Sequence, residues 1–242
     1  MTIFCFICYE YVTITYLSLA VTNYAEVWNL QKSIFSDLLE GKESDTLILC
    51  EHPPVYTLGR VTEAANILFS DDELQKIGAE KFEIERGGDV TFHGPGQLVG
   101  YPLLNLAHFK EDLGWYLRSL EETIILTLKE YGVRGFRISG RTGVWVGETG
   151  NEEKICAIGI KVSRWCTMHG FALNINTDLS YFDRIIPCGI GDKKVTSLEK
   201  ITGRKTDIEE VKELYQRSFK KIFDTDLSEL KTIADSGAYT RS

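Results

Sequence analysis

The chain has 242 residues, 43% of them hydrophobic, so it is long enough to bury a substantial core in one or two domains. Its 27 basic and 35 acidic residues give a formal net charge of −8, which argues against nonspecific binding of nucleic acid or of an anionic membrane. No linker-like composition interrupts the sequence. We therefore predict one domain over residues 12–225, preceded by an extension (1–11) and followed by a polar tail (226–242).

The first 21 residues are apolar but do not follow the pattern of a signal peptide. No Lys or Arg precedes Lys32, and Glu10 interrupts the apolar run. The β-branched and aromatic residues around Tyr11 and Tyr16 favour a strand over an inserted helix. We therefore expect a soluble, cytoplasmic protein.

Three amphipathic helices are predicted from apolar residues that recur at intervals of three and four. The first follows Asn23, which with Glu26 forms a potential capping box, and ends before Gly41. The second extends from about Asp112 to Tyr131. The third extends from Asp207, in another potential box with Glu210, to about Phe223.

Strand-like segments lie between these helices, in an irregular order. The segments between residues 143 and 175 follow one another too closely for helical crossovers, so they must form antiparallel hairpins. We predict an α+β fold, a single domain with a mixed, largely antiparallel sheet flanked by helices. The predicted strands are Thr46–Cys50, Lys81–Glu85, Gly143–Gly147, Ile155–Val162 and Thr167–Ile175.

The six cysteines are scattered along the chain. Only Cys5 and Cys8 have C-x-x-C spacing, and no second pair of ligands completes a zinc site, so we expect no metal. Reduced thiols fit a cytosolic protein.

A glycine-rich stretch extends from Arg86 to Gln97. Its glycines allow backbone amides to approach a ligand that a Cβ atom would block, although a turn-rich loop has the same composition. It matches neither the phosphate-binding loop nor the dinucleotide-binding turn, so a nucleotide is not indicated.

Two histidines have both a structural and a functional interpretation. His52 could orient the two prolines that follow it. His169 could be a core histidine in a strand, but Gly170 and Ala172 beside Phe171 would also suit the wall of an apolar tunnel.

Cys188 and Lys154 carry the two groups that acyl transfer requires. A thiolate attacks a thioester readily, and a nearby ammonium favours the thiolate. A free cysteine is more often a small buried hydrophobe, however, so the pair alone does not decide the function.

Four motifs in a fixed order resemble the lipoyl(octanoyl) transferase family over roughly residues 16–203. They are Arg86-Gly-Gly-Asp-Val-Thr-Phe-His-Gly-Pro-Gly-Gln97, Ala157-Ile-Gly-Ile-Lys-Val-Ser-Arg-Trp165, His169-Gly-Phe-Ala-Leu-Asn174 and Pro187-Cys-Gly-Ile190. The resemblance implies a fold shared with lipoate and biotin protein ligases, with residues 12–225 as the catalytic domain.

The resemblance also implies a reaction. An octanoyl or lipoyl group would pass from acyl carrier protein, through a thioester on Cys188, to a lysine of a lipoyl domain. The acceptors would be the E2 subunits of 2-oxoacid dehydrogenases and the H protein of glycine cleavage, and no cofactor would be needed. Lys154 matches the catalytic lysine of the family. The implied substrate-binding residues are Arg86, Gly87, Gly88, Asp89, Val90, Thr91, Phe92, His93, Ala157, Ile158, Gly159, Gly170, Phe171 and Ala172.

Two alternatives share the expected fold. An ATP-dependent lipoate or biotin ligase would activate a free acid and need no nucleophilic cysteine, and a noncatalytic acyl carrier would leave Cys188 and Lys154 without a role.

Cys156 and Cys166 stand where the family more often has other residues. A label on cysteine would therefore not by itself identify the nucleophile.

Overall fold

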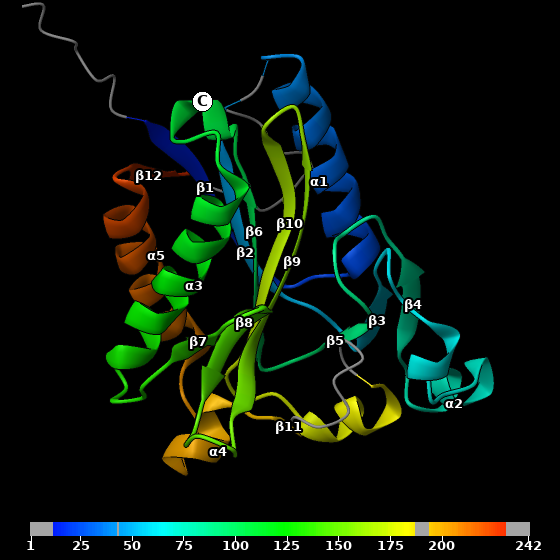
Figure 1. Cartoon of the computed structure of the whole chain (residues 1–242). Coiled ribbons are helices and arrows are strands. Elements are labelled where there is room, and N and C mark those ends of the chain that lie inside the picture. Colours follow the sequence, from blue (N-terminus) through cyan, green and yellow to red (C-terminus); the bar gives the residue numbers. More distant parts are fainter. Residues whose placement is uncertain (1–11, 43, 187–193, 231–242) are drawn as a thin grey trace, which may run out of the picture.

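The computed structural model describes residues 12–42, 44–186 and 194–230, which form two sheets and their covering helices (Figure 1). The large sheet has nine strands in this part of the chain, eight of them in the order β12-β1-β2-β6-β10-β9-β8-β7, with β11 paired to β9. Its strands are β1 (Thr13–Val21), β2 (Thr46–Glu51), β6 (Gln97–Leu103), β7 (Phe136–Ile138), β8 (Arg141–Val146), β9 (Glu153–Ser163), β10 (Cys166–Asn174), β11 (Lys194–Val195) and β12 (Asp226–Glu229).

The helices cover both faces of the large sheet. Helices α3 (Leu113–Lys129) and α5 (Ile208–Phe223) pack on one face, where Leu120, Ile124 and Phe219 are fully buried. Helix α1 (Tyr24–Leu39) packs on the other face through Val27 and Ile34. Figure 1 shows α3 and α5 side by side, with α1 across the sheet from them. Two short helices, α2 (Asp71–Lys76) and α4 (Leu198–Thr202), lie in the connections.

A smaller sheet stands beside the α1 face of the large one. It has three strands in the order β4-β3-β5, namely β4 (Glu80–Glu83), β3 (Val55–Leu58) and β5 (Thr91–His93). Tyr56, Leu74 and Phe92 form its own core. This sheet is joined to the large one by the connection from β2 to β3 and by that from β5 to β6.

The predicted fold class is confirmed. Strands β8, β9 and β10 form the expected antiparallel hairpins, whereas β1 pairs in parallel with both β2 and β12. Six strands were not predicted, because short or glycine-interrupted segments lack a clear period of two; they are β3, β5, β6, β7, β11 and β12. None of the helices in the described ranges is long and apolar enough to span a bilayer.

Two details of the predicted helix ends are wrong. Asn23 and Asp207 do cap α1 and α5, each through the backbone N–H two residues later (Ala25 and Glu209). Neither helix has the predicted reciprocal bond from its glutamate, so these ends are simple caps. A complete capping box forms instead at α2, between Ser70 and Glu73.

Candidate active site

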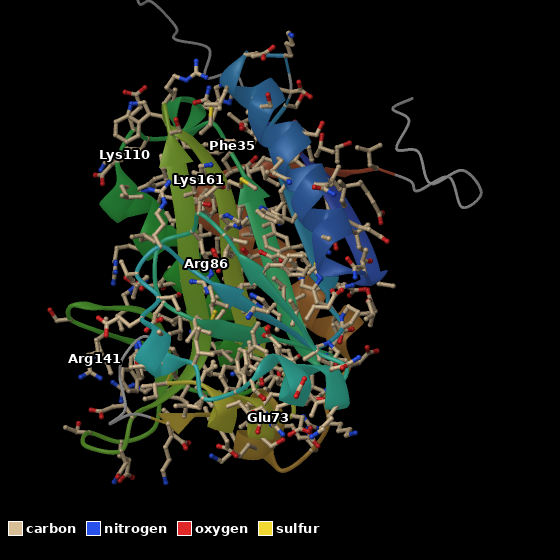
Figure 2. The ribbon with its side chains drawn as sticks, turned by 90° about the vertical axis from the view of Figure 1, so that its right-hand side faces the viewer. Phe35, Glu73, Arg86, Lys110, Arg141 and Lys161 are labelled. Atoms are coloured by element: carbon tan, nitrogen blue, oxygen red, sulfur yellow. The ribbon has the colours of Figure 1, made fainter. Side chains whose placement is uncertain are left out.

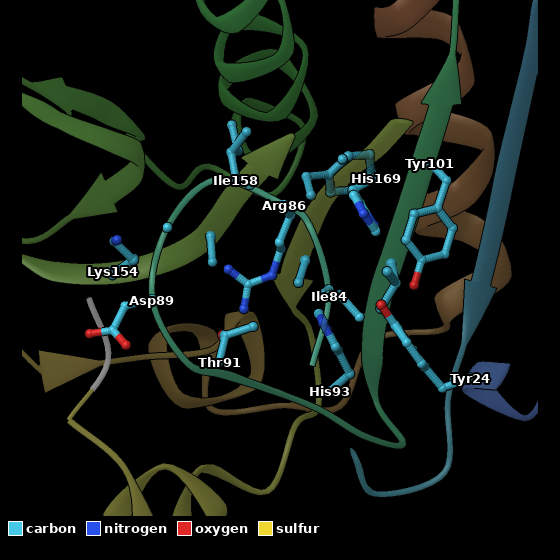
Figure 3. A pocket seen from close by; sticks show the side chains of 17 residues that line it. Tyr24, Ile84, Arg86, Asp89, Thr91, His93, Tyr101, Lys154, Ile158 and His169 are labelled. Atoms are coloured by element: carbon cyan, nitrogen blue, oxygen red, sulfur yellow. The ribbon is translucent and has the colours of Figure 1, made fainter. Parts of the chain in front are cut away.

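A pocket lies between the two sheets, on the face of the large sheet that α1 covers (Figure 3). Its walls come from β6, β9 and β10 on one side, and from β5 and the segment before it on the other. Ile84, Val99, Ile158 and Phe171 make much of the lining apolar. Lys154 and Tyr101 stand at opposite ends in Figure 3, with Arg86 between them.

Arg86 anchors the glycine-rich segment that forms one wall. Its side chain is 7% exposed and donates hydrogen bonds to the Thr57 carbonyl oxygen (2.7 Å), the Thr57 hydroxyl (3.0 Å) and the Gly87 carbonyl oxygen (3.1 Å). These contacts satisfy a buried cation with acceptors and tie the segment to β3. Arg86 is labelled near the middle of the view in Figure 2.

Glycine is required where this segment meets β9. The Gly87 N–H donates to the Ile160 carbonyl oxygen at 2.8 Å. A Cβ atom on Gly159 would lie 2.8 Å from the Gly87 carbonyl oxygen and 3.0 Å from Cδ of Arg86. The two backbones therefore approach as closely as the glycine-rich sequence suggested.

Lys154 reaches the pocket because β9 contains a bulge. Val144 pairs with Cys156 but Trp145 pairs with Lys154, which leaves Ile155 as an extra residue on β9. Ile155 and Cys156 both enter the core beneath α3 and α5, while Lys154 and Ala157 line the pocket. A bulge re-aims side chains in this way.

The backbone of β8 is shaped to receive the Lys154 side chain. Gly143 has a φ of +119° and its N–H donates to Oε1 of Glu121, a fully buried carboxylate of α3, at 3.0 Å. A Cβ atom at Gly143 would lie 2.5 Å from the Cys156 carbonyl oxygen and 3.5 Å from Cε of Lys154. Arg118 and Arg137 pair with Glu121, so its charge is compensated.

Hydrogen bonds fix the tautomers of two buried histidines. Gln97 donates its amide to the Phe92 carbonyl oxygen and to Oδ1 of Asn174, so its oxygen must accept from Nδ1 of His93 (2.8 Å). Nε2 of His93 is therefore the acceptor nitrogen of the ring, and it lies 3.4 Å from the Thr57 hydroxyl.

Hydrogen bonds also fix the tautomer of His52, which contacts the pocket residue Tyr101. Its Nδ1 donates to the Thr22 carbonyl oxygen, so Nε2 accepts from the Tyr101 hydroxyl, both at 2.7 Å. Tyr24 packs edge-on against His52 and is nearly parallel to the ring of His93. His52 therefore holds Tyr101 and the start of α1 in place, which differs from a role in orienting the prolines.

The histidines around the pocket are held neutral. Desolvation by burial lowers the pKa of His52 to about 4, and those of His93 and His169 to about 3. His169 has a left-handed backbone (φ 63°), and its Nε2 has no hydrogen-bond partner among the described residues. Of the three, His93 and His169 line the pocket, so their neutral rings are part of its wall.

The described cysteines are poor nucleophiles. Cys50, Cys156 and Cys166 are buried free thiols, and burial raises the pKa of each. For Cys156 this holds even though Lys154 lowers the pKa. Cys188, the predicted nucleophile, lies outside the described residues.

Eleven of the predicted substrate-binding residues line the pocket, and three do not. Val90 and Phe92 belong to the core of the small sheet, and Gly87 contacts β9 through its backbone. The eleven are Arg86, Gly88, Asp89, Thr91, His93, Ala157, Ile158, Gly159, Gly170, Phe171 and Ala172.

Other residues of the pocket were not singled out from the sequence, namely Tyr24, Ile84, Val99 and Tyr101. They come from three separate segments (α1, the residue after β4, and β6), and no local pattern distinguishes them from core residues. Lys161, inside the second motif, does not line the pocket: it pairs with Glu85 at 3.1 Å and lies over the Phe35 ring (Figure 2).

Comparisons with known proteins place the chain in a family. The model of the lipoyl protein ligase A/B catalytic domain matches residues 23–220. An octanoyltransferase of Christiangramia forsetii is 48% identical over 223 residues, which cover 87% of this chain and 95% of the relative. An octanoyltransferase of Rubrobacter xylanophilus is 50% identical over 204 residues, covering 84% and 90%.

Solved structures share the fold at low sequence identity. A lipoate-protein ligase A bound with ATP superposes with a TM-score of 0.73 at 16% identity, covering 93% of this chain and 90% of that one. The bipartite lipoate protein ligase of Thermoplasma acidophilum gives 0.71 at 18% identity, covering 93% and 88%. These likenesses concern the fold alone, and they confirm its predicted likeness to lipoate ligases.

The fold and the matching family model together define the class: this chain belongs to the lipoyl protein ligase A/B catalytic-domain family. Its resemblance to the lipoyl(octanoyl) transferases is likewise confirmed by relatives that match over most of their length. The chain is an acyltransferase of that kind.

Proposed function

We propose that this enzyme transfers an octanoyl or lipoyl group from acyl carrier protein to a specific lysine of a lipoyl domain, through a thioester on Cys188. The observation that carries the proposal is the pocket, in which an apolar channel lined by Ile84, Val99 and Ile158 ends at the amine of Lys154. The acceptors we propose are the lipoyl domains of 2-oxoacid dehydrogenase E2 subunits and the H protein. We place the reaction in the cytoplasm and assign it to residues 12–225.

The nucleophile is assigned by its sequence motif, and the burial of the described cysteines supports that choice. Cys50, Cys156 and Cys166 are buried with raised pKa values, which disfavours a thiolate at each. Cys188 lies in the Pro-Cys-Gly-Ile motif that resembles the family's acyl-carrying site.

The first half-reaction acylates the enzyme. An ammonium about 4 Å from a thiolate attracts it by up to roughly 4 kcal/mol at an effective dielectric of about 20, enough to lower a thiol pKa substantially. The Cys188 thiolate attacks the thioester carbonyl carbon, and the bond to the carrier sulfur breaks. The Lys154 ammonium gives its proton to the departing carrier thiolate and becomes neutral.

The second half-reaction forms the amide. The neutral amine of the acceptor lysine attacks the carbonyl carbon of the acyl-enzyme, and its proton passes to Nζ of Lys154. The carbon–sulfur bond breaks and restores the thiolate of Cys188 beside an ammonium. Because a thioester already stores the free energy needed to acylate an amine, this sequence of steps requires no ATP.

One experiment separates this function from an ATP-dependent ligase. The purified protein is mixed with octanoyl acyl carrier protein and a lipoyl domain in nucleotide-free buffer. The mass of the lipoyl domain is then measured by mass spectrometry. We expect octanoylation there, and little with free octanoate, ATP and magnesium. Efficient use of free octanoate by Cys188→Ala would instead identify a ligase. Binding of the acyl carrier without transfer would identify a noncatalytic module.

Peptide mapping of the acyl-enzyme tests the nucleophile. We expect the octanoyl group on the peptide that contains Cys188, and its loss in Cys188→Ala. Cys156→Ala is the matched control, because this thiol follows Lys154 by two residues but is buried, and it should retain the acyl-enzyme. Acylation of Cys156 or Cys166 in the unaltered protein would refute the assignment.

A further inference from the structure

We propose that Trp145 is a positioning residue for Lys154, and that the face of its indole ring stabilises the charged form of the Lys154 amine. This inference rests on the proposed function, in which Lys154 is the acid and the base. It assigns a role to a residue of β8 that lies outside the four sequence motifs.

The geometry places the ring directly against the amine. Trp145 is the pairing partner of Lys154 across β8 and β9, because the bulge at Ile155 shifts the register there. Nζ of Lys154 lies over the ring, 4.9 Å from its centroid. Trp145 is 1% exposed and Lys154 is 8% exposed, so water screens this contact little.

The side chain of Lys154 is also confined along its length. Gly143 and Trp145 are two residues apart on β8, and so lie on the same face of the strand. A Cβ at Gly143 would touch Cε of Lys154, so the lysine crosses β8 where no side chain intervenes. Trp145 then limits how far the amine can swing.

The ring affects the two protonation states of Lys154 unequally. An ammonium is attracted to the negative face of an indole, whereas a neutral amine is not. The ring therefore holds Lys154 in its charged form while the enzyme awaits the donor. Once the enzyme is acylated, the same attraction opposes the neutral form of Lys154 that accepts a proton.

Other charged or titratable groups face Lys154 and would act on it in every variant alike. Arg86 and Asp89 line the same pocket, and Cys156 follows on the same strand. Glu121 reaches β8 from α3. Further groups next to Lys154 in the described sheet are His93, Glu153 and Lys194.

Replacing Trp145 by phenylalanine isolates the ring. The indole N–H of Trp145 has no hydrogen-bond partner among the described residues. The substitution therefore replaces the indole face by the weaker phenyl face and removes no described hydrogen bond. Phenylalanine keeps a weaker face, and leucine has none.

The test measures the second half-reaction alone. Octanoyl-enzyme is prepared with octanoyl carrier and isolated, and its transfer to a lipoyl domain is followed by mass spectrometry from pH 6 to pH 10. In Trp145→Leu the midpoint of the pH–rate profile should move to lower pH by about 0.5–1.5 units, and in Trp145→Phe by less. Phe219→Leu, at a buried aromatic of α5, is the control for lost packing and should leave the midpoint unchanged.

The outcomes distinguish this inference from the proposed function. If Trp145→Phe and Trp145→Leu lower the rate but keep the midpoint, or move it to higher pH, Trp145 only fills space and the inference fails. Lys154→Met is measured in the same series. Normal transfer by that variant would instead remove Lys154 from the mechanism, and the proposed function would fail with it.

Discussion

Lys154 and Ala157 face the same pocket although they are three positions apart on one strand. In a regular strand, residues separated by an odd number of positions point to opposite faces. The extra residue Ile155 reverses this parity, and it buries its own side chain in the core. One irregular residue thus brings the amine and the acyl pocket to the same side of the sheet.

Two substitutions of Lys154 should separate its two roles. Lys154→Arg keeps a positive charge that cannot give up its proton, whereas Lys154→Met has no charge. We expect the arginine variant to acylate Cys188 faster than the methionine variant, and both to transfer poorly to the lipoyl domain. Single-turnover mass spectrometry measures the two steps separately. Equal, near-normal turnover by both variants would contradict the assignment.

Gly143→Ala should impair the enzyme through Lys154. Its Cβ would lie 2.5 Å from the Cys156 carbonyl oxygen, at a φ of +119° that disfavours any side chain. We expect a loss of roughly 1–3 kcal/mol of unfolding free energy and a larger relative loss of transfer activity. Gly140→Ala is the control, because its φ is +75° but no atom lies within 4 Å of the Cβ. It should cost about 1 kcal/mol in urea unfolding and retain activity; equal activity losses would argue against the steric account.

Ala172→Leu should shorten the acyl pocket. Ala172 is 4% exposed and lines the pocket together with Thr91 and Asp89. A leucine there would occupy space that the acyl chain needs, so transfer of octanoyl should fall more than transfer of hexanoyl. Competition between the two acyl carriers, read by mass spectrometry of the lipoyl domain, gives the ratio. An unchanged ratio would indicate that the acyl chain does not lie along this wall.

Stability should fall as the pH drops below about 6.5, the pKa of an unperturbed histidine. The folded pKa values of His52, His93 and His169 are depressed to about 4, 3 and 3, so the unfolded chain binds more protons between pH 6.5 and 4. Within that range, each histidine lowers the free energy of unfolding by about 1.4 kcal/mol for each unit by which the pH falls. Urea unfolding at several pH values measures the slope.

His93→Gln provides the check on that slope. The glutamine does not titrate, so the variant should lose one histidine's share of the pH dependence whatever its stability at pH 7. An unchanged slope would mean that His93 is not buried in its neutral form.

The helices and the antiparallel hairpins could be predicted from the sequence alone. The apolar positions Val27, Ile34 and Leu38 recur with the helical period, and the same residues are buried in α1. The motifs also contain most of the residues that line the pocket. Close approach of two backbones requires glycine, and glycine positions can be read directly from the sequence.

The face of β9 on which each side chain lies depends on how the strand pairs in the folded protein. A period-two pattern would place Lys154 and Ala157 on opposite faces, and the bulge that prevents this arises from pairing with β8. Tyr24 and Tyr101 reach the pocket from α1 and β6, which are joined to β9 by packing and not by local sequence. Strand pairing and packing between distant segments are long-range interactions, and no short stretch of the chain encodes them.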